Sequence, residues 1–507
     1  MSIIDFNDVS YIYPHSRNKA LDNINISVMQ GEFLAVMGET GAGKSSFCKL
    51  INGIIPLLYG GRFYGTVTID GICAEKSSVP QLALKVGMVM DDPDAQLFTS
   101  SVREEAAFGP ENILLPPGEI EERVEYALNA VGLKGFEDQN PSSLSGGEKQ
   151  RLAIAAALSM KGIILVLDEP LCRLDPKGAE EVMSVLKDLQ KKEKITIIMA
   201  AHNSDLMLKH ADRVCVLKNG KIAALDTAEI VFSNAVLLEN NGIQSPKIVY
   251  KYFHTESTED TENAELGGER SLEPTPFNSS AIFAPLASSA ITICNLNFKY
   301  PSGTGISNIN LTVNEGDLIA LIGDNGCGKT TLLKCITGLL RHSEGEIFIR
   351  DRNTKQLSVS DISNDIGFVM QNPDTQLFTD SVFKEAAFAL KNMRLSKTEI
   401  TKRVNEALDI AGLQDADAFP HALSLADRTK TVIACVLAMG CKIIILDEID
   451  VGNDYNGSLK IMNILRSLQE KGFTIIFVTH NMFLAQEYAH RLIKLDRNGI
   501  VYDRRRE

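Results

Sequence analysis

GETGAGKS at residues 38–45 and GDNGCGKT at residues 323–330 decide the fold of this 507-residue chain. Both match the pattern G-x-x-x-x-G-K-[ST], and each follows an apolar run, FLAVM (33–37) or LIALI (318–322). The glycines let the backbone curl until successive N–H groups face one phosphate, and the helix that follows adds its positive N-terminal end. The sequence therefore predicts two phosphate-binding loops, each between a buried strand and a helix.

Side chains in these loops are the first candidates for binding a nucleotide. Lys44 and Lys329 are expected to reach the β- and γ-phosphates, and Ser45 and Thr330, which follow them, to bind Mg²⁺. A chance Gly-Lys-Ser is common, but a strand, the full motif and a helix that occur together twice are typical of a nucleotide site. The glycines expected to form the backbone cradle are Gly38, Gly41, Gly43, Gly323, Gly326 and Gly328.

A second pair of motifs supplies carboxylates. LVLDEP (165–170) and IILDEI (444–449) each bring an apolar strand to Asp-Glu. The Asp is expected to bind Mg²⁺ and the Glu to orient and deprotonate water, a role that contributes about 10²–10⁴ in rate. An Asp-Glu pair that only caps a helix is the alternative, and the apolar run before it argues against that. The predicted residues are Asp168 and Asp447 for the metal, and Glu169 and Glu448 for catalysis.

One histidine follows each of these acids at nearly the same distance along the chain. ITIIMAAH (195–202) and FTIIFVTH (473–480) indicate buried parallel strands because their apolar character is unbroken. A lone histidine at a strand end is usually structural. The repeated spacing favours a role in positioning water or the γ-phosphate for His202 and His480.

The motifs belong to one domain plan that occurs twice. VMDDPDAQLFTSSVREEAAF (89–108) recurs as VMQNPDTQLFTDSVFKEAAF (369–388). Strands alternate with amphipathic helical stretches, so the predicted fold class is α/β with a central, mostly parallel sheet. FSNAVLLENNG (232–242) is expected to form a short helix at the end of the first copy. The predicted organisation is a first domain over 1–240, a polar linker over 241–289 and a second domain over 290–507.

Composition and charge exclude several functions. The 44% of hydrophobic residues is typical of a globular protein, and no apolar run approaches the roughly 18 residues that cross a bilayer. The nine cysteines form no CxxC pair, so reduced thiols without a metal site are expected. The net charge of −14 argues against a nucleic-acid surface. The N-terminus lacks the pattern of a signal peptide, which favours a cytoplasmic protein.

With LSGGEKQR (144–151) between phosphate loop and Asp-Glu pair, the sequence resembles the nucleotide-binding domains of ABC ATPases over most of both copies. The resemblance implies a P-loop NTPase fold with a helical subdomain, duplicated in tandem, and ATP with Mg²⁺ as cofactors. In this family two domains pair head to tail, and each ATP lies between the phosphate loop of one and the signature of the other. Tyr13 and Tyr300 are implied to stack on adenine, unless they are ordinary strand-end aromatics. The signature residues implied to contact ATP are Ser145, Gly146 and Gly147.

Within this family, QNPDTQLF (371–378) looks like the energy-coupling-factor (ECF, or cobalt-type) importers, and DDPDAQLF (91–98) matches except at its first two positions. Such ATPases drive a membrane coupling subunit and a small substrate-binding membrane subunit, so the chain is implied to lie peripherally on the cytoplasmic face of the cell membrane. Gln371 is implied to serve both catalysis and the metal. Phe98 and Phe378 would line the groove for the partner's coupling helix, or would plug the local helical subdomain.

LSLADRTK (423–430) is the second copy's counterpart of the signature. Leu425 and Ala426 replace its two glycines, so this signature is expected to hold a γ-phosphate poorly. Head-to-tail pairing assigns it to the site of Lys44, which also has Asp91 where a glutamine belongs. The sequence therefore predicts one competent ATP site, formed by the second phosphate loop and the first signature. The other site is expected to bind nucleotide and to turn over slowly or not at all.

Two other functions stay open at this point. A soluble tandem ABC ATPase that acts in translation or on DNA would share the motifs, although such proteins usually carry basic segments. The fused ATPase of a sugar-type ABC importer is also tandem and often asymmetric. The transported molecule stays open among vitamins, vitamin precursors and metal ions, because specificity would lie in a membrane subunit.

Overall fold

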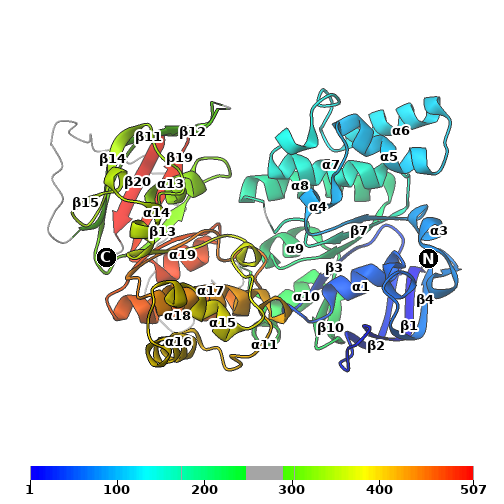
Figure 1. Ribbon diagram of the computed structural model, residues 1–507. Coiled ribbons are helices and arrows are strands. Elements are labelled where there is room, and N and C mark those ends of the chain that lie inside the picture. Colours follow the sequence, from blue (N-terminus) through cyan, green and yellow to red (C-terminus); the bar gives the residue numbers. More distant parts are fainter. Residues whose placement is uncertain (1, 173, 247–288, 302, 506–507) are drawn as a thin grey trace, which may run out of the picture. The chain divides into compact units, whose positions relative to one another are not determined.

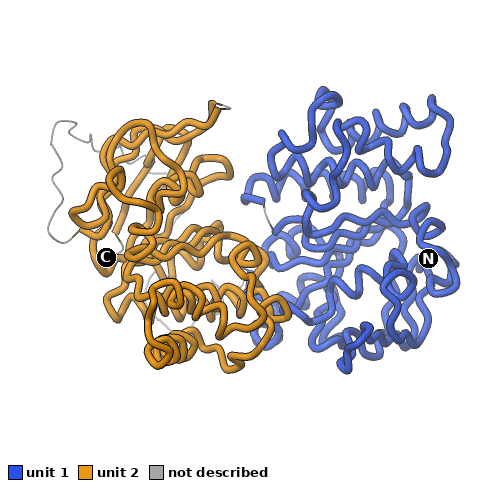
Figure 2. The backbone as a smooth tube through the Cα atoms, in the orientation of Figure 1, with its two compact units in different colours: residues 1–250, 454–456 blue, residues 251–453, 457–507 orange. Residues whose placement is uncertain are grey.

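The computed structural model describes residues 2–172, 174–246, 289–301 and 303–505. The chain divides into two compact units, which Figure 2 colours separately. The linker predicted over 241–289 lies mostly outside the described residues. Unit 1 comprises residues 1–250 with 454–456, and unit 2 comprises residues 251–453 with 457–507.

Two sheets form the framework of unit 1 (Figure 1). The larger has the strand order β10-β9-β3-β8-β7-β6, and all its neighbours are parallel except β10, which is antiparallel to β9. The smaller has the order β2-β1-β4-β5 and is antiparallel. The strands are β1 (Ser2–Ile12), β2 (Leu21–Met29), β3 (Phe33–Met37), β4 (Arg62–Ile69), β5 (Ile72–Cys73), β6 (Val86–Val89), β7 (Ile164–Asp168), β8 (Thr196–Ala200), β9 (Arg213–Lys218) and β10 (Lys221–Thr227).

The helices of unit 1 connect these strands, as parallel neighbours require. They are α1 (Lys44–Ile51), α2 (Ile54–Leu57), α3 (Val79–Ala83), α4 (Pro93–Gln96), α5 (Val102–Asn112), α6 (Pro117–Ala130), α7 (Gly146–Leu158), α8 (Pro176–Glu193), α9 (Ser204–His210), α10 (Ala228–Ser233) and α11 (Ala235–Asn240).

Unit 2 repeats this plan. Its larger sheet has the order β16-β17-β18-β13-β19-β20, parallel except for β20, and its smaller sheet has the antiparallel order β12-β11-β14-β15. The strands are β11 (Ser289–Lys299), β12 (Gly305–Asn314), β13 (Leu318–Ile322), β14 (Glu344–Ile349), β15 (Arg352–Asn353), β16 (Ile366–Val369), β17 (Ile443–Leu446), β18 (Thr474–Val478), β19 (Arg491–Asp496) and β20 (Gly499–Arg505). The helices are α13 (Lys329–Ile336), α14 (Val359–Ser363), α15 (Val382–Asn392), α16 (Lys397–Ala411), α17 (Leu425–Met439), α18 (Tyr455–Glu470) and α19 (Met482–Tyr488).

These sheets confirm the predicted α/β class with a mostly parallel central sheet. Strands β8 and β18, which were expected to be buried, are buried at every position. The helix predicted over 232–242 is present as α11, which follows the separate helix α10. Among the helices of the described ranges, none has both the length and the apolar character needed to cross a bilayer.

Helix α1 is held between the two sheets of unit 1. The ring of Phe47 stacks on Phe6 of β1 with 4.6 Å between centroids, and the same core includes Leu34 and Val36 of β3. Burial of aromatic and aliphatic side chains on both sides holds the helix firmly. Because the phosphate loop joins β3 to α1, this packing fixes the loop at the carboxyl edge of the central sheet.

A separate group of helices carries the signature sequence in each unit. Helices α5, α6 and α7 pack together in unit 1, as Figure 1 shows, and α15, α16 and α17 do so in unit 2 around a core of their own. The signature stands at the start of α7, and its counterpart at the start of α17. The helical subdomain implied by the family resemblance is therefore present twice.

Candidate nucleotide-binding sites

Both phosphate loops place their lysine under a curled backbone. Lys44 Nζ donates to the carbonyl oxygens of Gly38 at 3.0 Å and Glu39 at 3.2 Å. Gly38 has a φ of +146°, and a Cβ there would lie 2.3 Å from the carbonyl oxygen of Leu217. Only glycine fits such a position. In unit 2, Lys329 Nζ repeats these bonds to Gly323 and Asp324 at 2.8 and 3.0 Å.

The metal ligands predicted from sequence lie together in each unit. Ser45 Oγ donates to Asp168 Oδ1 at 3.0 Å, and Thr330 is hydrogen-bonded to Asp447. Burial raises the pKa of both aspartates to about 6, although these hydroxyls lower it. Asp447 Oδ1 is buried and has no partner among the described residues.

These groups fit a divalent cation that phosphates help to hold. A hydroxyl and a carboxylate are the hard oxygen ligands that Mg²⁺ prefers, and Mg²⁺ is usually bound by one or two protein ligands together with substrate phosphates. In the described ranges no group of three or more His, Cys, Asp or Glu side chains could hold a metal by itself.

Glu169 lies between Lys44 and His202 in unit 1. Its Oε1 is 2.9 Å from His202 Nε2 and 3.4 Å from Lys44 Nζ. Burial raises the pKa of this carboxyl, but His202 and Lys44 outweigh burial and lower the pKa to about 2. The glutamate has a φ of +51°, a conformation that side chains other than glycine rarely adopt. Strain of this kind is concentrated at functional sites.

Glu448 has different partners in unit 2. Gln371 Nε2 donates to its Oε2 at 2.5 Å, and His480 Nε2 is 3.4 Å from its Oε1. Its φ of +48° matches that of Glu169. The predicted residues Gln371, Glu448 and His480 are thus brought together by the fold. No ion pair joins Lys329 to Glu448 in the described part of the unit.

Asp91 takes the place of Gln371 in unit 1, and its charge acts on the metal ligand. Burial is the largest cause of the raised pKa of Asp168, and the charges of Glu169 and Asp91 raise this pKa further. A carboxylate at this position repels the anionic substrate and lacks the N–H donor of an amide.

The two predicted adenine-stacking tyrosines point toward the phosphate-loop helices. Tyr13 OH lies 3.1 Å from Ser46 Oγ of α1, and Tyr300 OH lies 3.4 Å from Thr331 Oγ1 of α13. Both side chains are partly exposed. This places them beside the loops, and stacking on adenine stays a prediction.

The two signatures begin their helices in the same way but differ in side chains. Ser145 caps α7, where its Oγ accepts from the N–H of Glu148 at 3.3 Å, and Ser424 caps α17 through Asp427 at 3.2 Å. A Cβ on Gly147 would meet nothing within 4 Å, so nothing in the unit requires glycine there.

Residues that sequence reasoning passed over build the Q-N-P-D-x-Q-L-F loop. Gln96 Oε1 accepts from Met90 N at 3.0 Å, and its Nε2 donates to Met88 O at 3.2 Å. Gln376 makes the same two bonds at 2.8 and 2.9 Å. These glutamines close the loop on itself. Their recurrence in both copies was the only sequence signal for this role.

The aspartate of the same loop joins it to the signature helix. Lys149 Nζ is 2.6 Å from Asp94 in unit 1. Arg428 Nη1 is 2.8 Å from Asp374 in unit 2, and His421 is a further partner at 3.3 Å. In both units a residue of the signature is therefore tied to the loop that follows the sheet.

Phe98 and Phe378 project from this loop. They are 65% and 63% exposed, which argues against the interpretation that they plug the helical subdomain. Each rests edge-to-face on a second ring, Phe108 at 4.8 Å or Phe388 at 4.7 Å.

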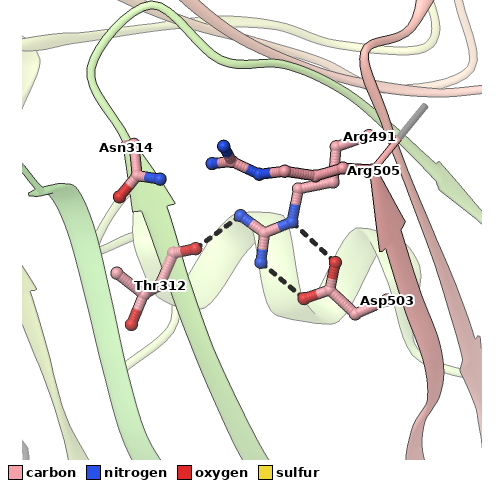
Figure 3. Close-up of a pocket in the computed structure, with 5 residues that line it drawn as sticks. All are labelled: Thr312, Asn314, Arg491, Asp503 and Arg505. Atoms are coloured by element: carbon pink, nitrogen blue, oxygen red, sulfur yellow. Dashed lines mark hydrogen bonds and ion pairs between the residues drawn. The ribbon is translucent and has the colours of Figure 1, made fainter. Parts of the chain in front are cut away.

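A depression in unit 2 lies away from these groups (Figure 3). Arg491 Nε donates to Asp503 at 2.6 Å, and Nη1 donates to the carbonyl oxygen of Thr312 at 2.7 Å. Arg491 is the first residue of β19, which runs parallel to β13, so the depression is at the amino edge of the sheet. The phosphate loop follows the carboxyl end of β13.

Comparison with known proteins agrees with this geometry. The family described as ABC transporter matches residues 21–172 and 306–450, one match in each unit. The chain belongs to the ABC transporter family. A relative from Methanosarcina mazei is 35% identical over 524 residues, which cover 99% of this chain and 89% of its own length. One from Caldanaerobacter subterraneus subsp. tengcongensis is 35% identical over 523 residues, with coverages of 98% and 91%.

Both relatives carry only the family-level name of ABC transporter ATP-binding protein. Membership confirms two ABC ATPase domains in tandem with the predicted P-loop NTPase fold, and ATP as the nucleotide they bind. Among solved structures, CbiO1 from Clostridium perfringens, part of the ABC transporter complex CbiONQ, is 34% identical. It covers 50% of this chain and 98% of its own, with a TM-score of 0.44.

Proposed function

We propose that this tandem ABC protein hydrolyses ATP to energise an importer of the ECF type. The observation that carries the proposal is the Q-N-P-D-x-Q-L-F loop, complete over 371–378 and nearly so over 91–98. Its partners would be a membrane coupling subunit and a small substrate-binding membrane subunit. The chain would lie peripherally on the cytoplasmic face of the membrane, and its cargo would be a vitamin, a vitamin precursor or a metal ion.

The construction of the loop supports a docking role for it. Glu105, which is buried, accepts hydrogen bonds from the backbone N–H groups of Phe98 and Thr99 at 3.0 and 2.9 Å. Glu385 does the same in unit 2. A buried carboxylate thus fixes the backbone of an exposed phenylalanine. A rigid apolar ring held out to solvent is suited to the apolar face of a partner helix.

We further propose that the two composite ATP sites differ in competence. Head-to-tail pairing of the domains would close the unit 2 phosphate loop with Ser145, Gly146 and Gly147. It would close the unit 1 loop with Leu425 and Ala426, which lack the close backbone approach of glycine. Support for the assignment comes from Asp91, which adds negative charge beside the same unit 1 loop. The unit 2 site would then carry steady-state hydrolysis.

In that site each residue has a definite task. Lys329 Nζ and the loop N–H groups would bind the phosphates, and Thr330 and Asp447 would hold Mg²⁺, which neutralises phosphate charge when bound. Glu448 would accept the proton of the attacking water. Gln371 Nε2 orients the Glu448 carboxylate by donating to Oε2, and His480 approaches the other oxygen.

The partner assignment is tested by purification from solubilised membranes. The intact protein is expected to copurify with two small membrane proteins, and Phe98→Ala with Phe378→Ala is expected to release them. Phe419→Ala is the matched control, because Phe419 is 51% exposed outside both loops. Copurification with ribosomes or nucleic acid would instead identify the soluble class, and sugar permeases as the partners would identify the sugar-type importer.

A further inference from the structure

The turn that follows Glu448 contains a partly buried acid, Asp450, with one side-chain hydrogen bond. Asp450 Oδ2 accepts a hydrogen bond from Thr479 Oγ1 at 2.8 Å. Its Oδ1 is buried and has no partner among the described residues. Residues that leave a buried carboxyl oxygen unpaired are unfavourable for folding. An acid at this position therefore calls for an explanation other than stability.

Thr479 links Asp450 to the chain segment that contains His480. Its hydroxyl, completely buried, donates to Asp450 and accepts from the backbone N–H of Asn481 at 2.9 Å. The hydroxyl of Thr479, which precedes His480, is thus hydrogen-bonded to the backbone of Asn481, which follows it. His480 Nε2 lies 3.4 Å from Glu448 Oε1. A short chain of bonds runs from the turn after Glu448 to the histidine that faces Glu448.

The described part of unit 1 has no such chain. Its matching positions are Leu171 and Ala201, as LDEPL (167–171) against LDEID (446–450) and AAHN (200–203) against VTHN (478–481) make plain. Leu171 packs against the apolar core of unit 1. Neither side chain can form a hydrogen bond. The acid and its hydroxyl partner thus occur together, and only in the unit whose glutamate is bound by Gln371.

Asp450 lies within electrostatic reach of Glu448 and His480. Burial raises the pKa of Asp450. The bond from Thr479, a bond from its own backbone N–H and the charge of His480 lower it, and the charge of Glu448 raises it. Both members of the Glu448–His480 pair therefore act on this carboxyl.

We propose that Asp450 is a positioning residue for ATP hydrolysis in unit 2. Through Thr479 it fixes the segment 479–481 and so holds His480 at the distance from Glu448 that the attacking water requires. This inference rests on the proposed function of the unit 2 site. It gives that site a device that the unit 1 site lacks, in addition to the difference in signatures.

The test replaces the polar pair with the apolar pair of unit 1. Asp450→Leu combined with Thr479→Ala removes both side-chain groups of the Asp450–Thr479 bond together, so neither is left without the other, and the N–H of Asn481 loses its hydroxyl acceptor. Loss of one orienting hydrogen bond is expected to lower the rate of ATP hydrolysis by about tenfold. Affinity for a non-hydrolysable ATP analogue and the melting temperature are expected to stay at the wild-type values.

A conservative variant separates positioning from packing. Asp450→Asn keeps an oxygen that can accept from Thr479, and it is expected to retain the wild-type rate. Equal loss in Asp450→Asn and Asp450→Leu would overturn the hydrogen-bond account. So would a double variant that hydrolyses ATP normally, or one that loses analogue binding together with hydrolysis.

Glu448→Gln is measured in parallel to separate the two proposals. If Glu448→Gln leaves hydrolysis intact, the proposed function of the unit 2 site fails. If Glu448→Gln abolishes hydrolysis while the Asp450 and Thr479 variants do not lower it, only the positioning role fails.

Discussion

Glu169 and Glu448 stand at the same place in the two units, with nearly the same backbone strain, yet their neighbours differ. Glu169 contacts Lys44 and His202, whereas Glu448 contacts the amide of Gln371 and His480, so the described part of unit 2 has no counterpart of the lysine contact. His202 and Lys44 lower the pKa of Glu169 to about 2 against the effect of burial, and a carboxylate of such low pKa accepts a proton weakly. An Asp-Glu motif therefore does not by itself set the pKa of its glutamate, which depends on the side chains that contact it.

The same comparison extends to the lysine of each loop. In unit 1 the Lys44 ammonium is shared between the loop carbonyls and Glu169. In unit 2 Lys329 bonds to loop carbonyls alone among the described contacts. A phosphate that enters the unit 1 loop therefore competes with a carboxylate for its main cation.

The largest expected effect separates the two glutamates. Glu448→Gln removes the proposed base and is expected to lower steady-state ATP hydrolysis by about 10² or more. Glu169→Gln is expected to change it little. Release of inorganic phosphate under saturating Mg²⁺-ATP measures both. Equal losses in the two variants would contradict the proposed asymmetry between the two ATP sites. A larger loss in Glu169→Gln than in Glu448→Gln would reverse it.

A variant designed to gain ATP hydrolysis at the unit 1 site tests the same difference between the two sites. In the Glu448→Gln background, Asp91→Gln combined with Leu425→Gly and Ala426→Gly restores the amide and the glycines of a complete site. Hydrolysis is expected to rise by about tenfold or more, because orienting donors are each worth at least that much. Adding Glu169→Gln serves as the control and is expected to remove the gain. A restored rate that survives this change would show that Glu169 is not the base.

The predicted metal ligands Asp168 and Asp447 are expected to affect stability in the same way in both sites. Burial raises the pKa of Asp168 and of Asp447 from 3.8 to about 6. Between these values the folded chain holds a proton that the unfolded chain releases, so stability falls as the pH rises through this window. Above pH 6, Asp168→Asn and Asp447→Asn are each expected to raise the free energy of unfolding by about 1–3 kcal/mol without nucleotide.

Chemical denaturation between pH 4 and pH 8 measures this effect. The advantage of both variants is expected to vanish below pH 4 and to be lost again with saturating Mg²⁺-ATP, because the wild-type carboxylate then binds a cation. A stabilisation that persists with Mg²⁺-ATP would argue against the metal role.

The smallest effect concerns the two helix caps. Ser145→Ala and Ser424→Ala each remove a hydroxyl that accepts from a backbone N–H, and each is expected to lower the free energy of unfolding by about 1 kcal/mol. Their effects on hydrolysis are expected to differ, since only Ser145 belongs to the site that we propose to be competent. Melting curves and phosphate release on the two proteins measure both properties. A similar fall in rate for both would contradict the assignment of signatures.

Much of each site could be predicted because its residues lie in local motifs. Lys44, Ser45 and their counterparts follow glycines, and the glycine pattern of the motif predicts a curled loop. Asp168 ends an apolar strand, and the unbroken apolar run predicts that this strand is buried. The contact of Lys44 with Glu169 could not be predicted. The contact depends on the direction that the long lysine side chain takes within the curled loop. The same two motifs in the described part of unit 2 do not form it.

Contacts between distant positions were missed for a similar reason. Asp94 meets Lys149, and Asp374 meets Arg428, only because the helical subdomain folds back onto the loop. Asp450 and Thr479 are both unremarkable alone in the sequence, and their pairing follows from the adjacency of the turn after β17 to the end of β18. Periodicity identifies elements, but it does not reveal which side chains meet across them.

The start of helix α7 has a consequence for how such chains evolve. Glycine in the middle of a helix weakens it by roughly 0.5–1 kcal/mol relative to alanine. Gly147, in the first turn of α7, occupies open space that a methyl group would fill without conflict. Helix α17, which starts with Leu425 and Ala426, is free of this weakness. An alanine at position 147 would therefore fit the fold, so a demand on ATP binding, and not on stability, would keep glycine there.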